Sequence, residues 1–139
     1  MAIRLQDINE RIFKIEQTLR FLKEFSSDCH KIIEKKIEGD ALLYNLYLLS
    51  DRVLRLAEVV CKYKNAGYPD SYSGFIYRLG DIGILEKEFA YEFASIAKFR
   101  NVLAHQYEEI DKQKICDEMQ SNLASVEKFL HQIKNAIGV

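Results

Sequence analysis

Residues that interrupt helices are scarce in this chain, which has 139 residues but only 1 proline and 6 glycines. Because these two residue types are the least compatible with a helix interior, their scarcity favours an all-helical protein. Tryptophan is absent, but hydrophobic residues make up 48% of the sequence, which is enough for a packed core and argues against disorder. The length predicts a single domain over residues 1–139.

Long hydrophobic runs and an excess of one charge are also missing. No run approaches the roughly 20 apolar residues that a membrane span requires. Residues 1–7 have no apolar signal core, so we expect a cytoplasmic protein without membrane association. The formal net charge of -1 gives no bulk attraction to nucleic acid, so any contact with RNA must be made by a local patch.

The cysteines are few, odd in number and far apart. Cys29, Cys61 and Cys116 show no C-x-x-C pairing, and we predict that they are reduced residues of a cytosolic protein. Cys29 and His30 are the one pair of neighbouring Cys and His residues, whereas a zinc site needs clustered ligands. We therefore expect no metal and no other cofactor.

Apolar spacings of three and four residues predict most of the helices. A first amphipathic helix begins near Leu5 and is interrupted at residues 26–28. A short helix over about 29–37 is expected to end at Gly39 as its C-cap. The next helix, about 40–65, carries two adjacent apolar rows. Either it is the central helix of a bundle, or its second row faces another subunit.

The second half of the chain is also predicted to be helical. A loop over 68–73 precedes a short helix at about 74–79. A continuous helix is expected to begin near Leu85, and a last helix spans about 111–136 with Asp111 as its N-cap.

The continuous helix from Leu85 carries the residues best suited to chemistry. On a helical wheel, Arg100 lies within the apolar arc, where a charge is costly unless it is paired or has a function. A row of alanines runs beside it, interrupted by Asn101, so we expect another helix to cross there and leave a crevice beside these two residues. His105 lies one turn after Asn101, and Tyr107 follows at the helix end.

These residues also have simpler interpretations. Arg100 could extend its charge to solvent or pair with an acidic residue of the core. His105 could be a surface or capping residue, and Tyr107 could serve only packing.

Residues 99–107, Phe-Arg-Asn-Val-Leu-Ala-His-Gln-Tyr, are followed by Ile110 and Asp111. This stretch resembles the Arg-Asn-x3-His-x-Tyr signature of the HepT toxins in the HEPN superfamily. Residues 68–72 are similar to the family's Pro-x-Ser-Tyr loop, and residues 79–85 to its Leu-x3-Gly-Ile/Val segment.

The resemblance implies a HEPN-type antiparallel helical bundle that forms a homodimer. The two motifs would face each other across a cleft and form a metal-independent endoribonuclease, the toxin of a type VII toxin–antitoxin pair that cleaves cellular RNA such as tRNA. The antitoxin would be a minimal nucleotidyltransferase that neutralises the toxin by AMPylation of Tyr107.

The same resemblance suggests a role for each candidate residue. His105 would transfer protons, Arg100 would stabilise charge on the phosphate, and Asn101 would orient His105 or hold a phosphate oxygen. Tyr107 would line the RNA path. Many relatives carry inward-facing acidic residues on the third helix, for which Asp51 is the best counterpart. The alternative is a non-catalytic helical dimer that binds a nucleotidyltransferase and is modified by it.

Overall fold

The structure is a computed structural model that describes residues 2–139, apart from the side chain of Tyr107. The described chain is helical and contains no strand. Its elements are α1 (Leu5–Phe25), a 3₁₀ turn (Ser26–Asp28), α2 (Cys29–Ile32), α3 (Lys36–Tyr63), α4 (Tyr72–Asp81), α5 (Lys87–Phe93), α6 (Ile96–His105), a second 3₁₀ turn (Tyr107–Glu109) and α7 (Lys112–Ile137).

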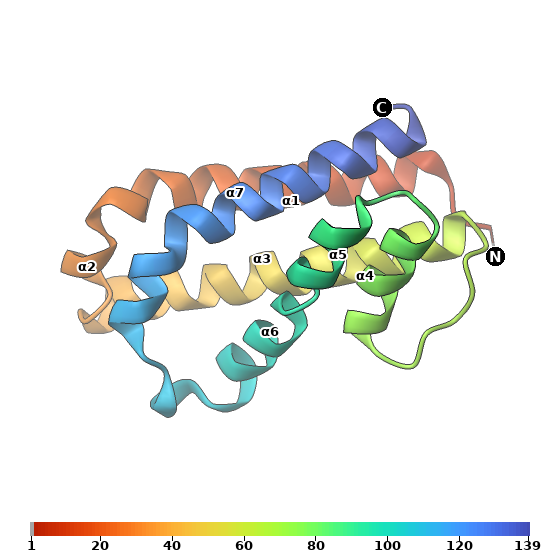
Figure 1. Cartoon of the computed structure of the whole chain (residues 1–139). Helices are drawn as coiled ribbons and strands as arrows, with labels where there is room; N and C mark the ends of the chain where they lie inside the picture. Colours follow the sequence, from red (N-terminus) through yellow and green to blue (C-terminus); the bar gives the residue numbers. More distant parts are fainter. Residues whose placement is uncertain (1) are drawn as a thin grey trace.

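The long helix α3 is the centre of the bundle (Figure 1). It packs against α1, α4 and α6, while α1 runs antiparallel to both α3 and α7. Both apolar rows of α3 are covered by the chain's own helices, since Leu46 and Leu54, one from each row, are 4% and 0% exposed. Of the two alternatives for this helix, the central position is therefore confirmed, and its second row gives no support for a subunit contact.

The predicted helix end at Gly39 is wrong, because this glycine lies inside α3. The short helix ends earlier, at Ile32, and α3 begins at Lys36. A Cβ at Gly39 would collide with the backbone carbonyl of Ile33, so the glycine allows the chain to turn tightly into α3. Gly39 thus has a structural role, but that role is to permit a close approach of two backbone segments and not to cap a helix.

The predicted continuous helix from Leu85 is also wrong, because it is divided into α5 and α6 at Ala94 and Ser95. The Ser95 hydroxyl donates a hydrogen bond to the carbonyl of Glu92 at 3.1 Å, a local bond of the kind that competes with helix continuation. The expected crossing at the alanine row occurs on α5, where a Cβ at Gly80 of α4 would lie 2.6 Å from the Cβ of Ala90.

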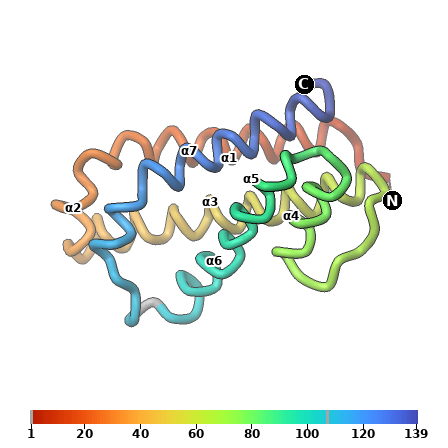
Figure 2. Tube along the Cα trace, in the orientation of Figure 1, coloured from red at the N-terminus to blue at the C-terminus, as the bar shows by residue number. Residues whose placement is uncertain are grey.

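The last helix begins as predicted, with the Asp111 side chain accepting a hydrogen bond from the backbone N–H of Lys114 at 3.1 Å. Figure 2 shows α7 running alongside α1. Among the described residues, no helix is both long enough and apolar enough to cross a membrane.

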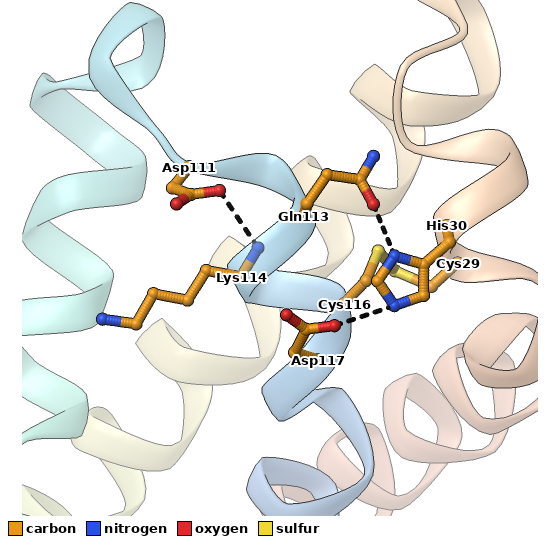
Figure 3. Close-up of a disulfide and its surroundings, with 7 residues drawn as sticks. All are labelled: Cys29, His30, Asp111, Gln113, Lys114, Cys116 and Asp117. Atoms are coloured by element: carbon orange, nitrogen blue, oxygen red, sulfur yellow. Dashed lines mark hydrogen bonds and ion pairs between the residues drawn. A yellow bond between two sulfur atoms is a disulfide. The ribbon is translucent and has the colours of Figure 1, made fainter.

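The prediction that all three cysteines are reduced is wrong for Cys29 and Cys116, which form a disulfide between α2 and the first turns of α7 (Figure 3). The pairing could not be predicted from the sequence, because the two cysteines are 87 residues apart and only the fold brings their Cα atoms to 5.5 Å. His30, next to Cys29, contacts Gln113 through Nδ1 and lies 3.1 Å from Asp117 through Nε2. Disulfides are rare in cytosolic proteins, so the cysteines no longer support a cytosolic assignment.

Candidate functional site

Arg100 of α6 faces Asp51 of α3 at the centre of the candidate site. The Nε atom of Arg100 lies 3.7 Å from Oδ1 of Asp51, and the two side chains are 17% and 16% exposed. Neither of these two atoms has a hydrogen-bond partner among the described residues, although both are buried. The other oxygen of Asp51, Oδ2, accepts a hydrogen bond from Nε of Arg55 at 2.8 Å. Of the interpretations open for Arg100, pairing with an acidic residue of the core is the one observed.

The electrostatic balance of this group leaves a positive charge. Asp51 raises the pKa of the Arg55 guanidinium above its ordinary value, chiefly through their hydrogen bond and then through charge attraction. The guanidinium groups of Arg55 and Arg100 carry two positive charges, and the carboxylate of Asp51 balances one of them. Arg55 is 52% exposed but Arg100 only 17%, so an anion is attracted most strongly at Arg100, where less water screens the charge.

The ring of Tyr72 also contacts the Arg100 guanidinium. The Cζ atom of Arg100 lies 5.0 Å from the centroid of the Tyr72 ring, which is a cation–π contact. Tyr72 is the first residue of α4, and the hydroxyl of Ser71 caps this helix by accepting a hydrogen bond from Gly74 N–H at 3.1 Å. A Cβ at Gly74 would lie only 2.8 Å from Pro69 Cβ, so the loop is tightly closed and the start of α4 is fixed.

A cavity of about 650 Å³ lies beside this arginine, between α4 and the α5–α6 segment. Arg100 and Asn101 both line it, which agrees with the crevice predicted from the helical wheel. Tyr72 and Lys98 also line it. A cation, an amide and an aromatic ring therefore border one hollow, and these are groups suited to a phosphate with an attached base.

His105 is separated from this cavity. It is the last residue of α6, it is exposed, and it is not among the residues that line the cavity. Five positions along a helix place it about 140° around the axis from Arg100. The structure thus brings Arg100, Asn101 and Asp51 together and leaves His105 on a different face of the same chain. Tyr107, the predicted modification site, has its side chain outside the described residues, so its role stays a prediction.

The sequence analysis assigned no role to Tyr72 or Arg55. Tyr72 was visible only as part of the Pro-x-Ser-Tyr resemblance, and Arg55 is one of several charged residues on the third helix. The order Asp51-x3-Arg55 is a helical i, i+4 pair and could have marked the two as neighbours. Within the described residues, no three His, Cys, Asp or Glu side chains gather in a way that could hold a metal ion.

Comparisons with known proteins agree on both sequence and fold. The profile of the family described as "Ribonuclease HepT-like" matches residues 15–133. A protein of Archaeoglobus fulgidus named "Putative RNase" is 22% identical over 121 residues, which cover 87% of this chain and 91% of that protein. A cytosolic protein of unknown function from Bacillus subtilis, YutE, has a structure that matches with a TM-score of 0.81 at 17% identity. That match covers 99% of this chain and 93% of the other, and at this identity it shows the fold alone.

Proposed function

The chain belongs to the HepT-like ribonuclease family, and from this premise we propose that it is a metal-independent endoribonuclease in which Arg100 and His105 act on the scissile phosphate. The observation that carries the proposal is the Arg100 guanidinium, which contacts both Asp51 and the Tyr72 ring at the wall of a cavity. A preorganised cation of this kind stabilises the charge that develops on phosphate oxygens in the transition state.

The reaction that suits these groups is an internal transesterification of RNA. The ribose 2′-oxygen loses its proton to a base and attacks phosphorus, so a new O2′–P bond forms. The P–O5′ bond breaks, and an acid protonates the leaving 5′-oxygen. One imidazole can take the proton of the 2′-hydroxyl and then, as imidazolium, give it to the leaving 5′-oxygen, so a single His105 in each site satisfies this balance. The products are a 2′,3′-cyclic phosphate and a 5′-hydroxyl, with no metal ion required.

A second copy of the chain would bring a His105 side chain to the Arg100 cavity. Within one chain, His105 lies on a different face from the Arg100 cavity, so a site that uses both residues must draw one from a partner or undergo a rearrangement. A symmetric dimer would bring His105 of one copy to the Arg100 cavity of the other, and the reverse, so that it contains two equivalent sites. We therefore include the homodimer in the proposal.

RNA cleavage by the purified protein tests the catalytic proposal. The unmodified protein is incubated with total tRNA in EDTA, alongside Arg100→Ala and His105→Ala, with Lys31→Ala as a surface control on α2. We expect discrete fragments ending in 2′,3′-cyclic phosphate from wild type and the control only. Absence of fragments from wild type, with the mass confirming an unmodified Tyr107, would favour the non-catalytic alternative. That alternative is a helical dimer that binds and is modified by a nucleotidyltransferase.

The proposal extends to regulation by a minimal nucleotidyltransferase antitoxin that attaches AMP to Tyr107. An AMP group adds bulk and negative charge next to the path of a phosphodiester, so the modified protein would repel its substrate. Co-expression with the nucleotidyltransferase should relieve toxicity in the wild type and add the mass of AMP to the peptide that contains Tyr107. Tyr107→Phe should remain toxic in the presence of the antitoxin. A Tyr107→Phe protein that is fully neutralised would show that control does not operate at this residue.

A further inference from the structure

The cavity beside Arg100 has a wall of tyrosines that the catalytic proposal does not use. Besides Tyr72, Arg100 and Asn101, the cavity is lined by Tyr77 of α4 and Tyr91 of α5. These two rings are 38% and 46% exposed, and their centroids lie 4.7 Å apart in a tilted arrangement. The two rings therefore pack against each other and stay partly exposed, and Nζ of Lys87 lies 5.8 Å from the centroid of the Tyr91 ring.

The orientation of this aromatic wall is fixed. The hydroxyl of Tyr91 donates a hydrogen bond to Oδ1 of Asp81 at 2.8 Å, and this bond raises the pKa of Tyr91 above its usual value. The hydroxyl thus stays protonated at neutral pH, and the ring is anchored at its outer end. Tyr77 lies one turn before Asp81 on the same helix and packs against the anchored ring. A preformed aromatic surface loses little side-chain entropy when a ligand binds.

The charges that line this cavity favour an anion. Lys98 and Arg100 are cationic, whereas the carboxylates of Asp51 and Asp81, which contact Arg100 and Tyr91, are not among the described residues that line it. Three other cavities of the described chain have acidic residues in their walls, such as Glu92, Glu127 and Asp51. In a chain whose net charge is -1, a cation-lined hollow is a local feature of the kind that nucleic-acid contact requires.

We propose that this cavity is a nucleotide subsite, in which the base lies against Tyr77 and Tyr91 while the adjoining phosphate meets Arg100. The inference rests on the proposed endoribonuclease function and adds where one nucleoside beside the scissile phosphate is held. The volume of about 650 Å³ is in the range of roughly 300–1,000 Å³ typical of small-molecule sites. Aromatic stacking accepts every base, so the subsite sets the path of the strand more than its sequence.

Binding of a substrate that cannot be cleaved tests the subsite separately from catalysis. A 2′-deoxy dinucleotide monophosphate lacks the attacking hydroxyl, so its affinity can be measured by NMR titration of tyrosine-ring-labelled protein. The wild type should bind it more tightly than inorganic phosphate, with shifts in the Tyr77 and Tyr91 rings. The Tyr77→Leu/Tyr91→Leu variant should bind it roughly 10-fold more weakly, since one base–aromatic stack contributes about that factor. Circular dichroism confirms that each variant is folded.

Two further variants complete the design. Tyr91→Phe keeps the ring and removes the bond that anchors it to Asp81, so it should bind the dinucleotide more weakly than wild type and more tightly than the double variant. Tyr44→Leu, a 59% exposed tyrosine of α3 outside the cavity, should bind normally. Equal affinity for the dinucleotide and phosphate, or no loss in the double variant, would overturn the subsite. Dinucleotide binding without RNA cleavage would instead reject the endoribonuclease proposal and leave the subsite standing.

Discussion

Asp51 Oδ1 and Arg100 Nε lie 3.7 Å apart, buried between α3 and α6, and neither atom has a hydrogen bond to any residue that the structure describes. This separation is too long for a hydrogen bond but short enough for strong charge attraction. The carboxylate therefore holds the guanidinium in place without occupying its donors fully. An arginine in this state is oriented and still able to bind phosphate.

The first prediction concerns this pair. Asp51→Asn keeps the shape of the side chain but removes the charge that orients Arg100, so kcat for RNA cleavage should fall roughly 10- to 100-fold, as expected from a small misplacement of a catalytic group. The unfolding free energy should fall by only about 1 kcal/mol, because both side chains retain some solvent contact. Single-turnover kinetics and thermal unfolding measure the two effects.

Glu58→Gln is the matched control for that experiment. Glu58 is also an acidic residue of α3, but it pairs with Lys62 on the same helix, 3.4 Å away. Its substitution should leave cleavage unchanged. If Asp51→Asn cleaves RNA at the wild-type rate, Arg100 does not depend on Asp51 for its position.

The second prediction separates the ring of Tyr72 from its hydroxyl. Tyr72→Leu removes the cation–π contact with Arg100, which contributes about 0.5–2 kcal/mol, so kcat/KM should fall several-fold or more. Tyr72→Phe keeps the ring over the guanidinium and should restore most of the activity. Equal losses in both variants would assign the effect to the hydroxyl and not to the ring.

The third prediction concerns the disulfide of Cys29 and Cys116. Closing a loop over 87 residues restricts the unfolded chain and stabilises the fold by up to about 4–5 kcal/mol. Reductant should therefore lower the melting temperature of the wild type by roughly 10 °C or more. The Cys29→Ser/Cys116→Ser variant should have the melting temperature of the reduced wild type, whether or not reductant is present. If reductant leaves the melting temperature of the wild type unchanged, the disulfide is not formed in solution.

The fourth prediction concerns the remaining thiol. Burial raises the pKa of Cys61 to about 11, and its Sγ lies 3.5 Å from the carbonyl of Phe75. The thiolate is the reactive form, so alkylation at pH 8 should be slow in the native protein and rapid after denaturation. Mass spectrometry should detect one alkylated cysteine after denaturation alone and three after denaturation with reduction. Rapid alkylation of the native protein would contradict the burial of Cys61.

The sequence predicted the helices wherever hydrophobic periodicity decides the structure. The apolar rows of α1, α3 and α7 are buried as expected, and Asp111 caps α7. Arg100 in an apolar arc correctly indicated a paired or functional charge. Local pattern is sufficient for these features, because burial of a helix face depends on spacing within one segment.

Features that depend on contacts between distant segments could not be predicted in the same way. The break at Ala94 and Ser95 contains neither glycine nor proline, so no strong helix breaker marked it in the sequence. The glycine at 39 serves a close approach to Ile33, which only the folded chain reveals. Asp51 was named beforehand through the family resemblance and not from any spacing that links it to Arg100, and the contact with Tyr72 joins residues 28 positions apart in a way that no helical spacing predicts.

The last prediction tests whether one active site combines two chains. Arg100→Ala and His105→Ala each remove a group that the proposed mechanism needs, and each homodimer should be inactive. A heterodimer of the two variants, purified through two different affinity tags, has an intact His105 on one protomer and an intact Arg100 on the other. If the site is shared across a symmetric interface, this heterodimer should regain up to about half of the wild-type activity.

The opposite outcome is equally clear, since a site built within one chain would leave every protomer of the heterodimer defective. The tagged heterodimer of Lys31→Ala with wild type controls for effects of the tags, because Lys31 lies on the surface of α2. Recovery of activity in the mixed dimer alone would explain why Arg100 and His105 lie on different faces of α6. Both faces would then meet a substrate only when two copies of the helix approach each other.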